Sequence, residues 1–146
     1  GVEYCAILKN VYAIVAGLCQ GLGYGDNFQS VLVCAAIQEC QELLEHTNSE
    51  FANFTKSAYL GDLLVTMYSG HSRNRQLGTL VGRGYSTSAA LIQCQQIPEG
   101  YYAIPGLIQL AQEKAIKMPI LQVINSIIYH KYAPALHIAS LSQTLN

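Results

Sequence analysis

A lysine in the most apolar part of the chain is the first residue whose setting suggests chemistry. Lys9 lies in the run Ala6-Ile7-Leu8-Lys9-Asn10-Val11, inside a predicted helix that is apolar almost all round. Burying an ammonium costs several kcal/mol unless it is paired, and desolvation makes an amine release its proton more readily. General acid–base chemistry at a carbonyl or an alcohol needs such a group. The alternative is a lysine that reaches solvent along its alkyl chain or pairs with a structural carboxylate.

The three arginines of the chain form a second group of interest, because they lie close together. Arg73, Arg75 and Arg83 fall within eleven residues. Ser72 is a predicted N-cap, so Ser72-Arg73-Asn74 would begin a helix, where free backbone N–H groups and the helix dipole favour an anion. A guanidinium adds a planar fork that matches phosphate. The pattern predicts a site for one small phosphate group, and the alternative is a set of surface arginines paired with glutamates.

A carboxylate and a histidine complete the candidate residues. Asp62 follows Gly61 and precedes the apolar run Leu63-Leu64-Val65. It could orient a substrate, pair with Lys9 or cap a helix, and the sequence leaves these roles open. His71 lies beside the arginines, but the four histidines show no spacing typical of a metal site, and we predict no bound metal.

The elements that must position these residues are predicted to be helical. Alternation of apolar and polar residues nowhere extends beyond a few positions, so the sequence predicts no strand. Apolar periodicity, caps and glycines indicate an all-α domain of seven to nine helices. Their expected ranges are 2–20, 27–46, 54–59, 61–68, 72–81, 86–94, 99–114, 119–129 and 132–143.

Local signals define where the first two helices end and begin. The run 21–25 has GxGxG spacing after a helix, which differs from a dinucleotide-binding fingerprint and indicates a tight turn between helices. Asp26 with Gln29 fits a capping box at the start of the second helix. Glu39, Glu42 and Glu45 are expected to lie mainly off the apolar face of that helix.

The composition describes one apolar, weakly charged domain. Of 146 residues, 51% are hydrophobic and 12% charged, and the net charge of -1 argues against disorder and against nucleic acid as a partner. So low a charge also fits a piece of a larger protein whose absent part covers apolar surface. The longest uncharged apolar stretch, 10–25, is too short for a membrane span. The five cysteines form no CxxC and are expected to be reduced core thiols of a cytoplasmic protein.

Short motifs follow one another along the chain in a distinctive order. They are Leu8-Lys9-Asn10-Val11, Ala16-Gly17, Gly21-Leu22-Gly23-Tyr24-Gly25-Asp26-Asn27, Gly61-Asp62-Leu63 through Thr66, Ser72-Arg73-Asn74-Arg75 and Glu99-Gly100. Together they resemble the C-terminal domain of the NAD(P)-dependent glycerol-3-phosphate dehydrogenases. The resemblance covers essentially the whole chain, and the order and spacing of several motifs make it specific.

The resemblance implies a fold and an activity. The fold is an all-α, multi-helix C-terminal domain of the 6-phosphogluconate-dehydrogenase-like type, which follows an N-terminal Rossmann domain that this chain lacks. Residues 1–146 would then be the helical substrate domain of a longer two-domain enzyme, and this chain alone would be inactive. That family couples reduction of dihydroxyacetone phosphate to sn-glycerol 3-phosphate with oxidation of NADH or NADPH. A homodimer is an expected assembly.

The resemblance also assigns site residues by position. Lys9 matches the residue that gives a proton to the carbonyl in reduction and takes one from the hydroxyl in oxidation. Substrate-binding positions are matched by Lys9, Asn10, Asp62, Thr66, Ser72, Arg73 and Asn74. Positions that bind the cofactor, NAD or NADP, are matched by Ile97, Glu99 and Arg73, of which Arg73 reaches both the substrate phosphate and the cofactor.

The chain departs from the family pattern at several positions. Gln20 stands where the family usually has aspartate, Ala35-Ala36 where an arginine is common, and Tyr59 where a glycine often precedes the Gly-Asp-Leu run. Two alternatives to the enzyme domain stay open at this point. One is a non-catalytic helical binding or dimerisation module of the same lineage, and the other is a related dehydrogenase of another phosphorylated hydroxy compound.

Overall fold

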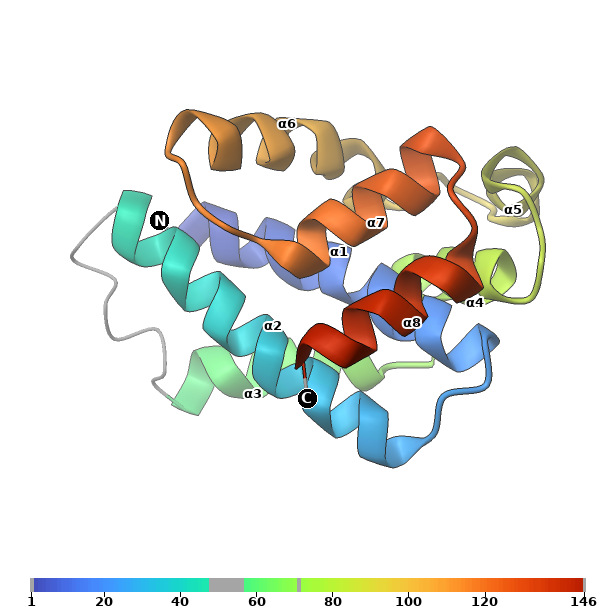
Figure 1. Cartoon of the computed structure of the whole chain (residues 1–146), viewed down its shortest axis with the longest axis horizontal. Helices are drawn as coiled ribbons and strands as arrows, with labels where there is room; N and C mark the ends of the chain where they lie inside the picture. Colours follow the sequence, from blue (N-terminus) through green and yellow to red (C-terminus); the bar gives the residue numbers. More distant parts are fainter. Residues whose placement is uncertain (1, 48–56, 71, 146) are drawn as a thin grey trace.

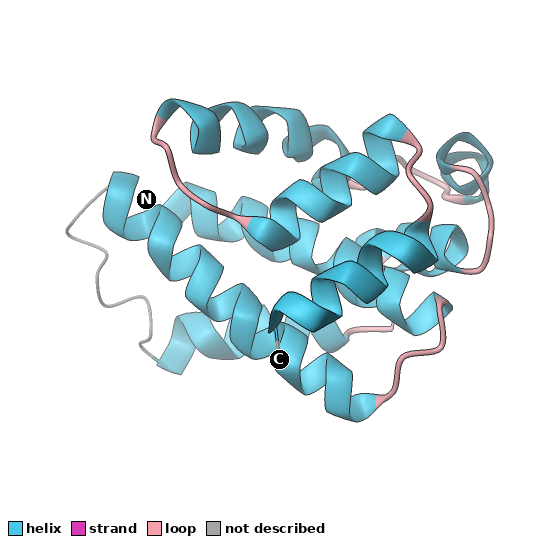
Figure 2. Cartoon of the chain, viewed as in Figure 1, coloured by secondary structure: helices cyan, strands magenta, loops and turns pink. Residues whose placement is uncertain are grey.

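The computed structural model describes residues 2–47, 57–70 and 72–145, and these residues form eight α-helices (Figure 1). The helices are α1 (Val2–Gly21), α2 (Asp26–Thr47), α3 (Ser57–Tyr68), α4 (Arg73–Gly82), α5 (Thr87–Gln93), α6 (Glu99–Glu113), α7 (Pro119–His130) and α8 (Pro134–Leu145). No strand occurs in the described ranges, so the predicted all-α class is confirmed (Figure 2). No described helix combines the length and the apolar character needed to cross a bilayer.

Helix α1 is the centre of the domain, as its apolar residues on every side predict. Residues 11–19 are all buried. The helix contacts α2, α3, α4, α6 and α7, and Figure 1 shows the other helices arranged around it. Successive side chains of α1 therefore meet different partners: Lys9 faces α3, Asn10 faces α6 and Tyr12 faces α2.

Helices α1 and α4 touch along their backbones, and glycines on both helices permit this contact. A Cβ added at Gly17 would lie 2.1 Å from a carbonyl oxygen of α4, and one added at Gly78 would lie 1.9 Å from a carbonyl oxygen of α1. One turn further along, the corresponding distances at Gly21 and Gly82 are 2.3 and 2.4 Å. Real Cβ atoms do not approach so closely, so these positions accept only glycine without a shift of the backbone.

The turn between α1 and α2 has the predicted tight form. Gly23 adopts a left-handed conformation, with φ +96°. Its N–H donates to the carbonyl of Gln20 and the N–H of Tyr24 donates to the carbonyl of Cys19, both at 3.0 Å. This pair of hydrogen bonds satisfies two carbonyls in the last turn of α1, and the conformation of Gly23 favours glycine.

Two helix starts differ from expectation. Helix α2 begins at Asp26, and Gln29 completes no capping box because its buried side-chain amide donates to the carbonyl of Ala16 at 3.1 Å. The predicted break between two short helices near 60 is wrong, because α3 continues through Gly61, where a Cβ would meet open space. The expected residues 54–56 lie outside the described residues. The other helix ends agree with the sequence to within two residues.

A buried carboxylate joins three helices. Glu39 of α2 is 5% exposed and accepts hydrogen bonds from the N–H groups of Ile120 (2.8 Å) and Leu121 (3.1 Å) and from the hydroxyl of Tyr12 (3.1 Å). The N-cap of α7, Met118, makes no side-chain hydrogen bond, so Glu39 caps that helix from outside. The expectation that Glu39 lies off the buried face is wrong. Burial raises its pKa to about 7, and the three hydrogen bonds partly offset that effect.

Candidate functional site

Lys9 of α1 and Asp62 of α3 form an ion pair at the edge of the core. The Lys9 Nζ donates to Asp62 Oδ2 at 2.7 Å, and the two side chains are 25% and 51% exposed. Asp62 lies in the middle of α3, so the interpretation as an N-cap is wrong, and pairing with Lys9 is the arrangement found. The Lys9 side chain is thus largely covered but still reaches solvent.

The first two residues of α6 connect α1 with α4. Asn10 of α1 donates through Nδ2 to Glu99 Oε2 at 3.3 Å. The next residue, Gly100, donates its N–H to Oδ1 of Asn74 at 2.9 Å, and Asn74 belongs to the first turn of α4. The start of α6 is therefore held between the helix that carries Lys9 and the predicted phosphate-binding helix start.

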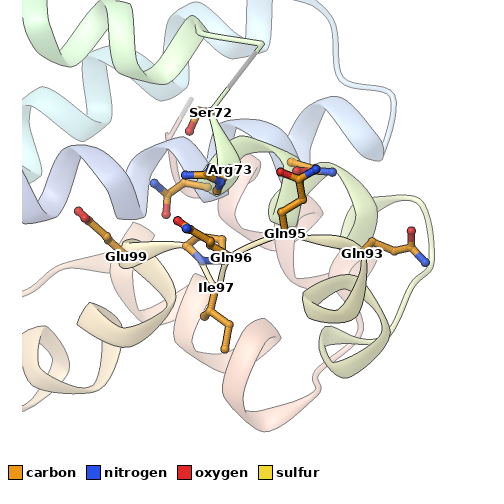
Figure 3. Close-up of a pocket in the computed structure, with 10 residues that line it drawn as sticks. Ser72, Arg73, Gln93, Gln95, Gln96, Ile97 and Glu99 are labelled. Carbon is orange, nitrogen blue, oxygen red and sulfur yellow. The ribbon is translucent and has the colours of Figure 1, made fainter.

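A cavity of about 670 Å³ opens at the start of α4. Ser72 caps this helix as predicted, and its side chain accepts a hydrogen bond from the N–H of Arg75 at 3.2 Å. The cavity is lined by residues 72–74 and Gln76 on α4, and by residues 93 and 95–99 (Figure 3). Its volume is within the range of small-molecule sites, and a helix start with free N–H groups forms one wall.

The cavity offers one cation and one carboxylate among many neutral amides. Figure 3 shows the Arg73 and Glu99 side chains at the same end, with Gln93 at the other end. Glutamines 76, 93, 95 and 96 add hydrogen-bond donors and acceptors without charge. The Arg73 charge also acts on the neighbouring Cys94: burial raises the pKa of that thiol, and Arg73 partly offsets the rise. The single cation at the start of α4 matches one small anionic group.

The three arginines separate in the structure, so the prediction that they act as one cluster is wrong. Arg75 is buried, donates through Nε and Nη2 to Gln20 Oε1 at 3.0 and 2.8 Å, and also donates to the carbonyl of Met67. Arg83 lies at the opposite end of α4 as its C-cap. Among the described residues, Arg73 alone of the three lines the cavity. Because Arg75 follows Arg73 by two residues, it lies on nearly the opposite side of α4, toward the core.

The remaining predicted site residues, Thr66 and Ile97, make no side-chain hydrogen bond with the described residues. Thr66 follows Asp62 by one turn on α3 and is half-buried. Ile97 is exposed on the segment before α6, and in Figure 3 its side chain points away from Arg73. His71 lies outside the described residues. The described residues contain no group of three or more His, Cys, Asp or Glu side chains that could hold a metal ion.

Sequence reasoning missed two features of the site. Gly100 fits between α4 and α1, where a Cβ would lie 2.7 Å from Asn74 Oδ1 and 2.9 Å from the carbonyl oxygen of Asn10. The only sequence signal was its place in the Glu99-Gly100 motif. Glutamines 76, 93, 95 and 96, which line the cavity, gave no sequence signal of a site, because exposed glutamines are common on protein surfaces.

Comparison with known proteins places this geometry in one family. The family model described as NAD-dependent glycerol-3-phosphate dehydrogenase C-terminus matches residues 1–139. Glycerol-3-phosphate dehydrogenase [NAD(P)+] 2 of Lactobacillus delbrueckii subsp. bulgaricus is 38% identical over 128 residues, which are 88% of this chain and 38% of that protein. Glycerol-3-phosphate dehydrogenase [NAD(P)+] of Syntrophomonas wolfei is 40% identical over 129 residues, with the same coverage of both proteins.

A solved structure agrees with the sequence relatives. The crystal structure of glycerol-3-phosphate dehydrogenase from Coxiella burnetii superposes with a TM-score of 0.91 and 32% identity, over 97% of this chain and 43% of that one. This chain spans less than half the length of the relatives that it matches. The resemblance inferred from the motifs is therefore confirmed, and the chain belongs to the family of C-terminal domains of NAD-dependent glycerol-3-phosphate dehydrogenases.

Proposed function

We propose that this chain is the substrate domain of a two-domain dehydrogenase that interconverts dihydroxyacetone phosphate and sn-glycerol 3-phosphate. One observation carries the proposal. The first turn of α6 links Asn10, the neighbour of the partly covered Lys9 amine, to Asn74, the neighbour of Arg73 at the start of α4. A proton-transfer group and an anion site are thus tied to one structural unit, as a small phosphorylated carbonyl compound requires.

Each residue has a chemical role in this proposal. Arg73 and the N–H groups that begin α4 bind the substrate phosphate. Lys9 gives a proton to the carbonyl oxygen in reduction and takes it back from the hydroxyl in oxidation, while Asp62 holds the ammonium in place at 2.7 Å. Asn10, Thr66, Ser72 and Asn74 complete the substrate contacts. The hydride itself is chemistry that NAD or NADP supplies when bound.

The cavity also fits one end of such a cofactor. Arg73 presents a cation to a phosphate, Glu99 and the glutamines present polar groups, and the exposed Ile97 offers apolar surface. We assign Arg73, Ile97 and Glu99 to the cofactor side. Most of the nucleotide would be bound by the N-terminal part of the protein, because this chain spans 38–43% of its relatives. Free thiols at Cys19, Cys34 and Cys94 support a reducing, cytoplasmic setting.

Activity of the longer protein tests this proposal. The coding sequence upstream of Gly1 should encode a strand followed by GxGxxG, and the whole protein should oxidise NADH or NADPH only when dihydroxyacetone phosphate is added. This chain alone should show no turnover. A whole protein that fails to use dihydroxyacetone phosphate, or a chain that turns over normally by itself, would contradict the proposal.

A further inference from the structure

We propose that Asn74 and Gly100 are positioning residues that couple substrate binding to cofactor binding through the first turn of α6. Asn74 would contact the substrate with its amide nitrogen while its amide oxygen holds the residue next to Glu99. The inference rests on the proposed function, and it adds a role for Gly100 and a direction of communication between the two halves of the site.

The start of α6 needs a cap from another helix. Its N-cap residue is Pro98, which makes no side-chain hydrogen bond. The N–H of Gly100 has no partner within α6, because the first N–H groups of any helix precede the carbonyls that could accept from them. Asn74 of α4 supplies the missing acceptor at 2.9 Å. The position of α6 is therefore set by a side chain of the substrate-binding run.

Glycine is required at position 100 for this contact. A Cβ there would lie 2.7 Å from Asn74 Oδ1 and 2.9 Å from the carbonyl oxygen of Asn10. Both atoms belong to well-packed helices, since Asn74 is only 9% exposed and the Asn10 carbonyl is part of α1. A larger residue would push the start of α6, and Glu99 with it, away from the cavity.

The oxygen and the nitrogen of the Asn74 side-chain amide have different roles. Oδ1 is turned to Gly100, and none of the described residues accepts a hydrogen bond from Nδ2. Asn74 also lines the cavity beside Arg73. The nitrogen is therefore the end available to a phosphate or hydroxyl oxygen, and a bound substrate would fix the amide that caps α6.

Glu99 carries the effect to the rest of the site. Its carboxylate accepts from Asn10, the residue after Lys9, and it lines the same cavity as Arg73. Fixing the start of α6 thus orders a cofactor-side residue and a neighbour of the proton donor together. Once the first ligand has fixed the start of α6, the second ligand does not pay the entropy cost of fixing it again. Each ligand should therefore lower the dissociation constant of the other by the same factor.

The experiment uses the whole two-domain protein and a pair of ligands that do not react with each other. The dissociation constant of NADH is measured by fluorescence with and without saturating sn-glycerol 3-phosphate, and the ratio of the two constants is the coupling factor. If the protein prefers NADPH, that cofactor replaces NADH. We expect at least about fivefold tighter cofactor binding in the presence of sn-glycerol 3-phosphate.

Three variants separate the steps. Gly100→Ala should reduce the coupling factor to near 1 while sn-glycerol 3-phosphate alone still binds. Asn74→Asp keeps an oxygen for the Gly100 N–H but loses the nitrogen, so it should weaken sn-glycerol 3-phosphate binding at least tenfold. Gly106→Ala is the matched control on α6, because a Cβ there meets nothing within 4 Å; it should keep the coupling of the parent.

The outcomes distinguish this inference from the proposed function. Full coupling in Gly100→Ala, or a parent protein that turns over but shows no coupling, would overturn the inference and leave the proposed function standing. A parent that binds no sn-glycerol 3-phosphate and does not reduce dihydroxyacetone phosphate would overturn the proposed function. If Gly100→Ala does not fold, Asn74→Ala replaces it, with weaker substrate binding and lost coupling expected together.

Discussion

The backbone of Gly78 in α4 lies directly against the carbonyl oxygen of Ile14 in α1, at a spacing that leaves no room for a methyl group. A Cβ at position 78 would approach that oxygen to 1.9 Å. The contact is made along the same two helices that carry Lys9 and Arg73. It therefore fixes how far Lys9 and Arg73 are from each other.

Substitution of Gly78 tests this packing. Gly78→Ala should lower the free energy of unfolding by about 3 kcal/mol, at the upper end of the cost of overpacking, because the neighbour is backbone and cannot rotate away. Gly106→Ala, in open space on α6, should instead raise it by about 0.5–1 kcal/mol, since alanine favours the helix. Urea unfolding measures both. Equal effects of the two substitutions would show that α1 and α4 are not packed this closely.

Removal of the Lys9 amine should affect the chemical step. Lys9→Ala in the whole enzyme should lower kcat by about 10²–10⁴, the usual contribution of a general acid or base, while the circular dichroism spectrum stays unchanged. Asp62, half-exposed, remains solvated after the loss of its partner. Lys114→Ala, at an exposed C-cap, is the control and should leave kcat as it is. An unchanged rate in Lys9→Ala would remove this residue from catalysis.

Arg73 should determine the affinity for the phosphate group. Arg73→Gln removes a charge-assisted hydrogen bond, so the KM for dihydroxyacetone phosphate should rise about 10- to 100-fold. Arg83→Gln removes the same charge at the other end of α4, outside the cavity, and should leave KM unchanged. Steady-state kinetics of the two variants gives the answer. A similar rise in both would indicate a general electrostatic effect in place of a specific site.

Glu39 should make the stability depend on pH. Its pKa in the folded protein, about 7, lies above the ordinary value of 4.5, so the folded state holds the proton more tightly between these pH values. The stabilisation from this group is complete below about pH 4.5, is lost as the pH rises through about 7, and amounts to about 3 kcal/mol at most.

The pH effect can be measured locally. Hydrogen exchange at the N–H groups of Ile120 and Leu121 should become faster between pH 5 and 8 beyond the intrinsic rate increase. Glu39→Gln should remove this extra dependence, and Glu42→Gln, an exposed neighbour on α2, should keep it. Identical exchange profiles in the parent and in Glu39→Gln would contradict the assignment.

Much of the fold could be predicted from the sequence because the signals are local. The apolar residues all round 2–20 predicted a central helix, and Ser72 was identified as an N-cap from its neighbours alone. Lys9 and Asp62 were found because a charge in an apolar run is unusual. Their ion pair could only be one of several possibilities, because 53 residues separate them.

Features that depend on distant contacts escaped the sequence. Glu39 reads as one more solvent-facing carboxylate until the start of α7 is placed beside it, 81 residues away. Arg75 reads as a partner of Arg73 until Gln20 is placed against its guanidinium. From the sequence, glycines 17 and 78 appear only as residues that destabilise a helix. Their packing role depends on another helix that crosses at the same point.

The backbone contact between α1 and α4 also limits how this domain can diversify. The two backbones can lie this close only where all four glycines face the other helix, because a Cβ at any of these positions would collide with it. The distance between Lys9 and Arg73 therefore cannot be adjusted gradually. A descendant with a longer or bulkier substrate would have to reshape the glutamine-rich segment 93–96 that faces α4. Changes in substrate size would therefore be confined to segment 93–96, while the packing of α1 against α4 stays the same.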